Sequence, residues 1–201
     1  GHAAQLCKNL EQFFQVVRGA GGSSALDVEC RCVEAPFPEP SRRASGRQWW
    51  RYDEDGMGDR PADWAEMEHA TTHLAEELDR AHRAASPYDG ILGFSQGAEM
   101  VHSLALLTHR QDARLQLPGA PRFVVSLSGA VNPGHFEAPG AGGPPRDCAG
   151  PRAGPGPGQL ATPCLFLGDF AQDGWYSKQR LEETLELYAD ATLVRHDQRH
   201  R

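Results

Sequence analysis

A pentapeptide near the middle of the chain, Gly93-Phe94-Ser95-Gln96-Gly97, has the composition of a serine nucleophile held on a sharp turn. A serine hydroxyl is a poor nucleophile, so an enzyme that uses it must expose the oxygen and supply a neighbouring base. The flanking glycines permit a strand-to-helix turn in which backbone atoms come close together. The N–H of Gln96 then starts a helix and can face a developing oxyanion. The alternative interpretation is a tight turn without chemistry.

Acids and histidines follow the serine in the order that such chemistry requires. Serine hydrolases built on this turn place the acid after a later strand and the histidine after the last strand. Asp169 and Asp173 follow the apolar stretch 163–167, and His196 and His200 follow the last apolar stretch of the chain. The order predicts a Ser-Asp-His triad, in which the histidine takes the serine proton and the carboxylate orients the imidazole.

The periodicity around these residues predicts alternating strands and helices. Short apolar runs indicate buried strands, and apolar residues spaced three and four apart indicate helices. This alternation is typical of βαβ units, so we expect an α/β fold with a doubly wound, mostly parallel sheet and helices on both faces. The expected strands are 28–34, 88–94, 122–128, 163–167 and 191–195, and the expected helices are 3–18, 64–84, 98–109 and 176–187.

The composition is that of an ordinary globular chain of 201 residues with an excess of glycine and proline. Fifteen of the 27 residues at 133–159 are Gly or Pro, which predicts a flexible insertion within a single domain spanning 1–201. The formal net charge of −7 favours neither nucleic acid nor an anionic membrane as a partner. No apolar run approaches the length of a membrane span, and no signal peptide is recognisable, so we expect a cytoplasmic location.

The five cysteines are odd in number and lack the spacing of a zinc site. We expect free thiols in a reducing compartment, with Cys30 and Cys32 on one face of a strand as core residues. His69 and His73 lie one helical turn apart but have neither a third ligand nor an HExxH motif, so we expect no metal. The cysteines are Cys7, Cys30, Cys32, Cys148 and Cys164.

Several stretches together carry a resemblance to a known family. They are Glu34–Pro38, Trp49–Asp53, Tyr88–Ala98, Phe123–Gly129, Thr162–Gly168 and the terminal His-x-x-x-His. The chain resembles the FSH family of serine hydrolases, a branch of the α/β hydrolases that includes small esterases and thioesterases. The resemblance implies the α/β-hydrolase fold and cleavage of a small-molecule carboxylic ester or thioester through an acyl-enzyme, without a metal or organic cofactor.

The resemblance also implies roles for individual residues. Ser95 is the nucleophile, and His200 stands where the family ending His-x-Gly-Gly-His has its second histidine, the base. The family acid stands three residues after a glycine and is followed by an apolar pair and a helix. Asp173 fits the downstream part of this pattern, with two extra residues after Gly168, whereas Asp169 fits neither part, which favours Asp173 over Asp169. His196 occupies the position of the first, structural histidine of the family ending.

The same resemblance indicates an oxyanion hole, and the aromatic cluster at 49–52 is a separate candidate for a substrate pocket. The backbone N–H groups of Gln96 and His2 are the expected oxyanion donors, because the chain opens on residues that match those after the family's first strand. Trp49, Trp50 and Tyr52 are candidates to line an acyl pocket. The alternative interpretation is that these aromatic side chains hold a long loop against the core.

Two departures from the family pattern keep other functions open. Gln198 and Arg199 replace the two glycines of the family ending, and no apolar strand precedes Gly1. We therefore expect a fragment that is poorly stable or inactive by itself, because the loss of a central strand exposes apolar faces and unpaired backbone. The alternatives to a hydrolase are a catalytically impaired binding or scaffold protein and an acyltransferase, and the oligomeric state is undetermined.

Overall fold

The computed structural model describes nine separate parts of the chain. Six candidate site residues lie outside them, as do all but the last residue of the expected insertion at 133–159. These six are His2, Tyr52, Asp169, Asp173, His196 and His200. The described parts are residues 7–11, 14–15, 28–38, 46–51, 64–84, 86–109, 121–131, 159–168 and 176–195.

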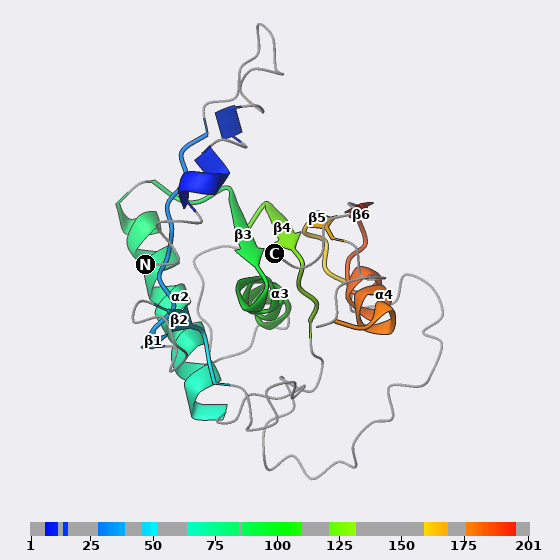
Figure 1. Cartoon of the computed structure of the whole chain (residues 1–201). Coiled ribbons are helices and arrows are strands. Elements are labelled where there is room, and N and C mark those ends of the chain that lie inside the picture. Colours follow the sequence, from blue (N-terminus) through cyan, green and yellow to red (C-terminus); the bar gives the residue numbers. More distant parts are fainter. Residues whose placement is uncertain are drawn as a thin grey trace, which may run out of the picture.

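A four-stranded parallel sheet forms the centre of the fold (Figure 1). The order of the strands across the sheet is their order in the sequence. A helix lies in the connection from the first strand to the second and in the connection from the third to the fourth, and part of every connection lies outside the described residues. This parallel sheet with helices packed on it confirms the predicted α/β-hydrolase fold class. The strands are β3 (Gly90–Phe94), β4 (Phe123–Leu127), β5 (Cys164–Leu167) and β6 (Ala191–Val194).

Three helices pack together beside this sheet: α2 (Trp64–Arg83), α3 (Gln96–His109) and α4 (Lys178–Glu186). Every residue of α3 from Ala98 to Leu107 is buried. A helix that is buried on all sides must be covered on all sides, and α3 lies between α2 and α4 (Figure 1). Of the expected N-terminal helix, residues 7–11 and 14–15 are helical. Among the helices that the structure describes, none has the length and apolar character needed to cross a membrane.

The two faces of the sheet are buried to different extents. On the face toward α3, Val124 and Phe166 are completely buried and belong to the main core. On the opposite face, Val125 is only half-buried, and Phe123 and Val194 keep 46% and 45% of their surface exposed. The helix α3, which follows the serine turn, therefore packs on the better buried face.

The segment after the first helix differs from the prediction. Residues 28–35 form no regular secondary structure, and no strand among the described residues pairs with them, so the expected strand at 28–34 is not part of a ladder. A two-residue strand, β1 (Phe37–Pro38), pairs antiparallel with β2 (Arg47–Gln48) instead. Pro38 fits in this ribbon because an edge strand tolerates a missing N–H.

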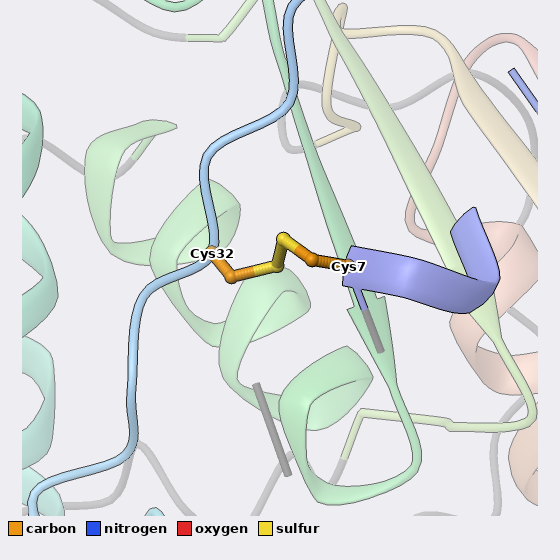
Figure 2. The surroundings of a disulfide bond; sticks show 2 residues. All are labelled: Cys7 and Cys32. Carbon is orange, nitrogen blue, oxygen red and sulfur yellow. A yellow bond between two sulfur atoms is a disulfide. The ribbon is translucent and has the colours of Figure 1, made fainter. Parts of the chain in front are cut away.

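The prediction that the cysteines are all free thiols is wrong for two of them. Cys7 and Cys32 form a disulfide whose Cα atoms lie 6.1 Å apart (Figure 2), within the usual range. Packing of the helical residues 7–11 near the segment 28–38 brings these cysteines together across 25 positions of sequence. Cys30 is free and exposed rather than in the core, whereas Cys164 is free and buried. Cys148 lies outside the described residues.

Candidate active site

Ser95 occupies a sharp turn between β3 and α3. Its φ of 54° lies in the left-handed region, which a non-glycine residue adopts only when its surroundings impose it. The Ser95 N–H donates to the carbonyl oxygen of Leu127 at 2.9 Å, which ties the turn to β4. The Ser95 carbonyl accepts from the N–H groups of Ala98 and Glu99 at 2.8 and 3.2 Å, which ties it to the first turn of α3. The backbone of the serine is thus fixed on both sides.

Two glycines leave the space that this turn needs. A Cβ atom on Gly93 would lie 2.2 Å from the carbonyl oxygen of Gly97, which is backbone and cannot move aside. A Cβ atom on Gly129, just after β4, would lie 2.4 Å from the Cβ of Ala98 and 2.7 Å from the carbonyl oxygen of Ser95. Gly97 itself is less restricted, because its added Cβ would meet only Trp49 Nε1, at 3.3 Å.

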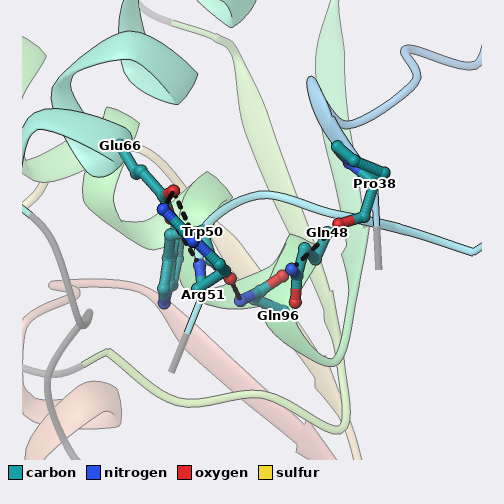
Figure 3. A network of polar contacts seen from close by, with 6 residues as sticks. All are labelled: Pro38, Gln48, Trp50, Arg51, Glu66 and Gln96. Atoms are coloured by element: carbon teal, nitrogen blue, oxygen red, sulfur yellow. Dashed lines mark hydrogen bonds and ion pairs between the residues drawn. The ribbon is translucent and has the colours of Figure 1, made fainter. Parts of the chain in front are cut away.

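The side chain of Gln96 clamps a distant segment against the turn (Figure 3). Its Oε1 accepts a hydrogen bond from the N–H of Trp49 at 2.7 Å, and its Nε2 donates to the carbonyl oxygen of Trp50 at 2.7 Å. The side-chain amide thus accepts from one backbone N–H of the segment and donates to the carbonyl oxygen of the next residue, the two kinds of bond that an adjacent strand would make. Gln96 is also the first residue of α3, and the first N–H groups of a helix have no acceptor within the helix. Its backbone can serve an oxyanion while its side chain holds the segment.

Glu66 on α2 holds the next residue of the same segment (Figure 3). The N–H of Arg51 donates to Glu66 Oε2 at 2.8 Å, and Arg51 Nε donates to Glu66 Oε1 at 2.6 Å. These bonds to the ionised form hold the pKa of the Glu66 carboxyl below its usual value, against the opposing effect of its burial. The segment is thus fastened to the helices before and after β3.

The two tryptophans of this segment have different surroundings. Trp50 is completely buried and belongs to the main core. Trp49 is half-buried, lies close to Gly97 and has its ring centroid 6.5 Å from that of His73 on α2. Of the two pocket candidates that the structure describes, Trp49 is therefore the one whose side chain lies at the serine turn. Tyr52 lies outside the described residues.

The loops that follow the strands all start at the same edge of the sheet as the serine turn. Phe94, Leu127, Leu167 and Val194 are in register across β3 to β6. The pattern continues one residue further, because Ser128 N donates to Leu167 O at 3.0 Å and Gly168 N donates to Val194 O at 3.2 Å. The stretches that carry the predicted acids and histidines therefore leave the sheet at the edge where Ser95 lies.

The serine hydrolase (FSH1) family profile matches residues 3–201, nearly the whole chain. The chain belongs to this family. An esterase from Caenorhabditis elegans is 33% identical over 88 residues, which cover 44% of this chain and 38% of that protein. The chain thus matches less than half the length of that relative.

Solved structures show the same fold as this FSH1-family chain. A carboxylesterase from Mesorhizobium loti has a TM-score of 0.56 at 19% identity, covering 84% of this chain and 66% of that one. The acyl-protein thioesterase 2 of Zea mays has a TM-score of 0.50 at 18% identity, covering 77% and 65%. At these identities the likeness concerns the fold, and it agrees with the parallel sheet and the helix after Ser95.

A buried chain of polar groups lies beneath the turn of this FSH1-family protein. His102, on α3, has Nδ1 2.7 Å from the hydroxyl of Tyr188 and Nε2 3.0 Å from the hydroxyl of Ser126. The Ser126 hydroxyl also donates to the carbonyl oxygen of Gly129 at 3.0 Å. Complete burial lowers the pKa of His102 to about 3, so the ring is neutral at physiological pH. The chain of contacts supports Gly129, which packs against Ser95.

A second buried contact joins α3 to the start of the α4 region. The hydroxyl of Tyr176 donates a hydrogen bond to Glu99 Oε1, and both residues are buried. Glu99 lies one helical turn after Ser95, whereas Tyr176 directly follows the stretch 169–175, which contains both candidate acids. This contact fixes Tyr176 relative to the serine turn.

The structure thus brings together Ser95, Gln96 and Trp49 among the predicted site residues. Glu66, Glu99 and His102 have supporting contacts that the sequence analysis did not identify. A polar residue at a helix position predicted to be buried was the available signal, because buried polar groups are nearly always hydrogen-bonded. Nothing in the local sequence indicated which distant residues would be the partners.

Proposed function

We propose that this chain is the catalytic region of a serine hydrolase that cleaves a carboxylic ester or thioester. Ser95 Oγ attacks the carbonyl carbon while His200 accepts the serine proton, and Asp173 orients the imidazole. The backbone N–H groups of Gln96 and His2 stabilise the oxyanion of the tetrahedral intermediate. The leaving alcohol or thiol takes the proton from His200, and water then hydrolyses the acyl-enzyme to a carboxylic acid.

The observation that carries the proposal is the left-handed backbone of Ser95 between a strand and a buried helix. This conformation is costly for serine, and three backbone hydrogen bonds together with the glycine contacts maintain it. A turn of this shape presents the serine hydroxyl at the sheet edge beside the first N–H of α3. Family membership supports the same chemistry.

Chain length favours His200 over His196 as the base. The turn at Ser95 and the end of β6 are separated by three strand spacings, or about 14 Å. His200 lies five residues beyond Arg195, and five residues span up to about 17 Å, whereas the Cα of His196 is only about 4 Å from that of Arg195. The base therefore belongs at the distal histidine.

The same reasoning supports Asp173 as the acid. The acid stretch leaves β5 two strand spacings, or about 10 Å, from the turn, and the acid must meet a histidine that lies beside Ser95. Asp173 is five residues beyond Gly168, whereas Asp169 is its immediate neighbour. In the sequence, Asp173 is also closer than Asp169 to Tyr176, whose hydroxyl donates a hydrogen bond to Glu99 on α3.

Trp49 supplies an apolar surface for the acyl group. Its indole lies close to Gly97, and its backbone is bound to the residue that donates to the oxyanion. An acyl chain bound against this ring would have its carbonyl near both Ser95 and the N–H of Gln96. This placement favours substrates with an apolar acyl group. Trp50 would support Trp49 from the core.

The test is covalent labelling by a fluorophosphonate probe, combined with turnover of p-nitrophenyl esters and acyl thioesters. We expect Ser95→Ala to abolish labelling and to lower turnover at least about a thousandfold, because the nucleophile is lost. Ser103→Ala is the matched control, since Ser103 lies two turns further along α3 with its hydroxyl bound to the helix backbone. Undiminished labelling of Ser95→Ala would overturn the assignment.

The alternatives give different results in the same experiment. A binding or scaffold protein unfolds cooperatively but neither labels at Ser95 nor turns over esters. An acyltransferase labels at Ser95 and transfers the acyl group to an added alcohol or amine faster than to water. Substitution of His200 and of Asp173 by alanine then tests the other two triad positions, with His196→Ala and Asp169→Ala as their matched controls.

A further inference from the structure

Three cysteine sulfur atoms lie together on the described N-terminal part of the chain. Cys7 comes from the helical residues 7–11, and Cys30 and Cys32 come from the segment 28–38. Their Sγ atoms all lie within 4.8 Å of one another. Cys7 and Cys32 are joined by the disulfide (Figure 2), and Cys30 is a free, exposed thiol beside it. We call these three residues the cysteine cluster.

We propose that the cysteine cluster is a thiol–disulfide exchange site, in which Cys30 opens the Cys7–Cys32 disulfide from within the chain. The Cys30 thiolate attacks the sulfur of Cys7, a Cys7–Cys30 bond forms and the Cys7–Cys32 bond breaks. The electron pair of the broken bond leaves on the Cys32 sulfur, which takes up the proton that Cys30 gave to solvent. One disulfide is lost and one is formed, so neither an oxidant nor a reductant is consumed.

Attack at Cys7 is favoured over attack at Cys32 because it joins two separate segments of the chain. A Cys30–Cys32 bond would instead have to close across a single intervening residue, which leaves little freedom to reach the Cα separation and dihedral angle of an unstrained disulfide. Cys7 lies on a different segment and can pair with either partner.

The exchange changes the chemical state of a cysteine that lines a hollow in the described part of the chain. Cys32 lines a hollow of about 230 Å³ together with Glu34, Ala35, Arg47 and His73. His73 Nε2 lies 3.1 Å from the carbonyl oxygen of Glu34, and its ring is the neighbour of Trp49. When Cys7 is bound to Cys30, Cys32 carries the free thiol, and this thiol lines the hollow. The helical residues 7–11 are then linked to the segment at position 30 instead of position 32.

The surroundings of Cys30 determine the conditions for the test. Partial burial raises the pKa of its thiol, so the thiolate is scarce at neutral pH and the exchange is slow there. The charged side chains next to it, Arg31 and Glu29, are exposed and bind each other at 3.0 Å. A mildly alkaline buffer therefore raises the thiolate fraction enough for exchange to be followed.

The experiment maps disulfides over time in the protein purified without reductant. Samples held at pH 8.5 are blocked with N-ethylmaleimide, digested without reduction and analysed by mass spectrometry. We expect both Cys7–Cys32 and Cys7–Cys30 peptides, with the blocking group on Cys30 in the first and on Cys32 in the second. The initial rate should fall about tenfold at pH 7.5, because the thiolate fraction falls tenfold per pH unit below the pKa.

Two matched variants separate the proposal from exchange with other thiols. Cys30→Ser should leave the Cys7–Cys32 peptide as the sole product and Cys32 unlabelled. Cys148→Ser and Cys164→Ser should leave the partition unchanged. The proposal is overturned by a Cys7–Cys32 peptide that persists alone in the wild type, by labelling of all three cluster cysteines, or by exchange that needs Cys148. None of these readouts depends on hydrolase activity.

Discussion

The serine turn and the segment Trp49–Arg51 are neighbours, but different forces hold them. The turn is fixed by backbone hydrogen bonds and by close backbone packing, which is possible because Gly93 and Gly129 have no side chain. The segment is fixed by two side chains, Gln96 and Glu66, which bind its backbone from α3 and α2. The first kind of restraint depends on close packing and the second on individual hydrogen bonds.

This difference assigns different parts of the proposed site to the two regions. Close packing between backbone atoms leaves no room for adjustment, so the position of Ser95 is set by the fold itself. A segment held by side-chain hydrogen bonds can shift when one bond is lost, at a cost of about 1–3 kcal/mol for each unsatisfied buried group. In the proposed site, the turn therefore carries the reacting atoms, and Trp49 on the segment forms a substrate-binding surface whose position can change.

The largest expected effect comes from adding one carbon atom to the turn. Gly93→Ala places a Cβ 2.2 Å from the carbonyl oxygen of Gly97, so β3 and α3 must separate. We expect a loss of about 3 kcal/mol or more in the free energy of unfolding, or failure to fold. Denaturant unfolding followed by circular dichroism measures this.

Gly97→Ala is the matched control for that substitution. Its Cβ would lie 3.3 Å from Trp49 Nε1, at the end of a side chain, and alanine is a better helix former than glycine by about 1 kcal/mol. We expect a change of at most about 1 kcal/mol in either direction. Equal losses from the two substitutions would contradict the view that backbone packing at Gly93 fixes the turn.

His102 beneath the turn gives the next largest effect, through pH. Its pKa is about 3 in the folded chain and about 6.5 when unfolded, so the unfolded state binds more protons between these values. The stabilisation is complete above pH 6.5 and is lost as the pH falls toward 3. Between pH 7 and pH 5 this amounts to about 2 kcal/mol.

The substitution His102→Gln removes this titrating group. We expect the variant to be less stable at pH 7 but to lack the loss of about 2 kcal/mol on acidification to pH 5. His109→Gln, at the exposed end of the same helix, should retain the wild-type pH dependence. Denaturant unfolding at the two pH values measures both. A His102→Gln variant with the full wild-type pH dependence would be incompatible with a neutral, buried imidazole.

The features predicted correctly from the sequence are those that depend on local patterns. The apolar runs at β3, β4, β5 and β6 indicated strands, and the glycines around Ser95 indicated a tight turn, because strand burial and turn sterics act over a few residues. Residues 28–34 were predicted as a strand for the same reason. Their pairing depends on a neighbouring strand, which the local pattern does not specify.

Long-range partners were not predictable from a single sequence. The amide of Gln96 binds residues 46 and 47 positions earlier, and the hydroxyl of Tyr188 lies beside an imidazole 86 positions earlier. No regular spacing of residues in the sequence predicts either contact, because both depend on how the helices pack. The disulfide between Cys7 and Cys32 was missed for the same reason, since the spacing of cysteines does not state which segments meet.

The smallest expected effect tests the segment side of the comparison. Gln96→Glu keeps an acceptor for the N–H of Trp49 but places a carboxylate oxygen against the carbonyl oxygen of Trp50, in place of the donated hydrogen bond. We expect the free energy of unfolding to fall by about 1–2 kcal/mol. Ester turnover should fall as Trp49 shifts, while fluorophosphonate labelling of Ser95 persists because the backbone of the turn is unchanged.

Gln48→Ala supplies the control, because that side chain binds the carbonyl oxygen of Pro38 at the exposed β1–β2 ribbon (Figure 3). Its loss should change stability by less than about 0.5 kcal/mol. A Gln96→Glu variant as unstable as Gly93→Ala would mean that the segment belongs to the same fixed frame as the turn. An intermediate loss of free energy of unfolding, with labelling retained, would instead show that Trp49 moves independently of the nucleophile. Substrate preference could then change through the position of Trp49 without a change in the position of Ser95.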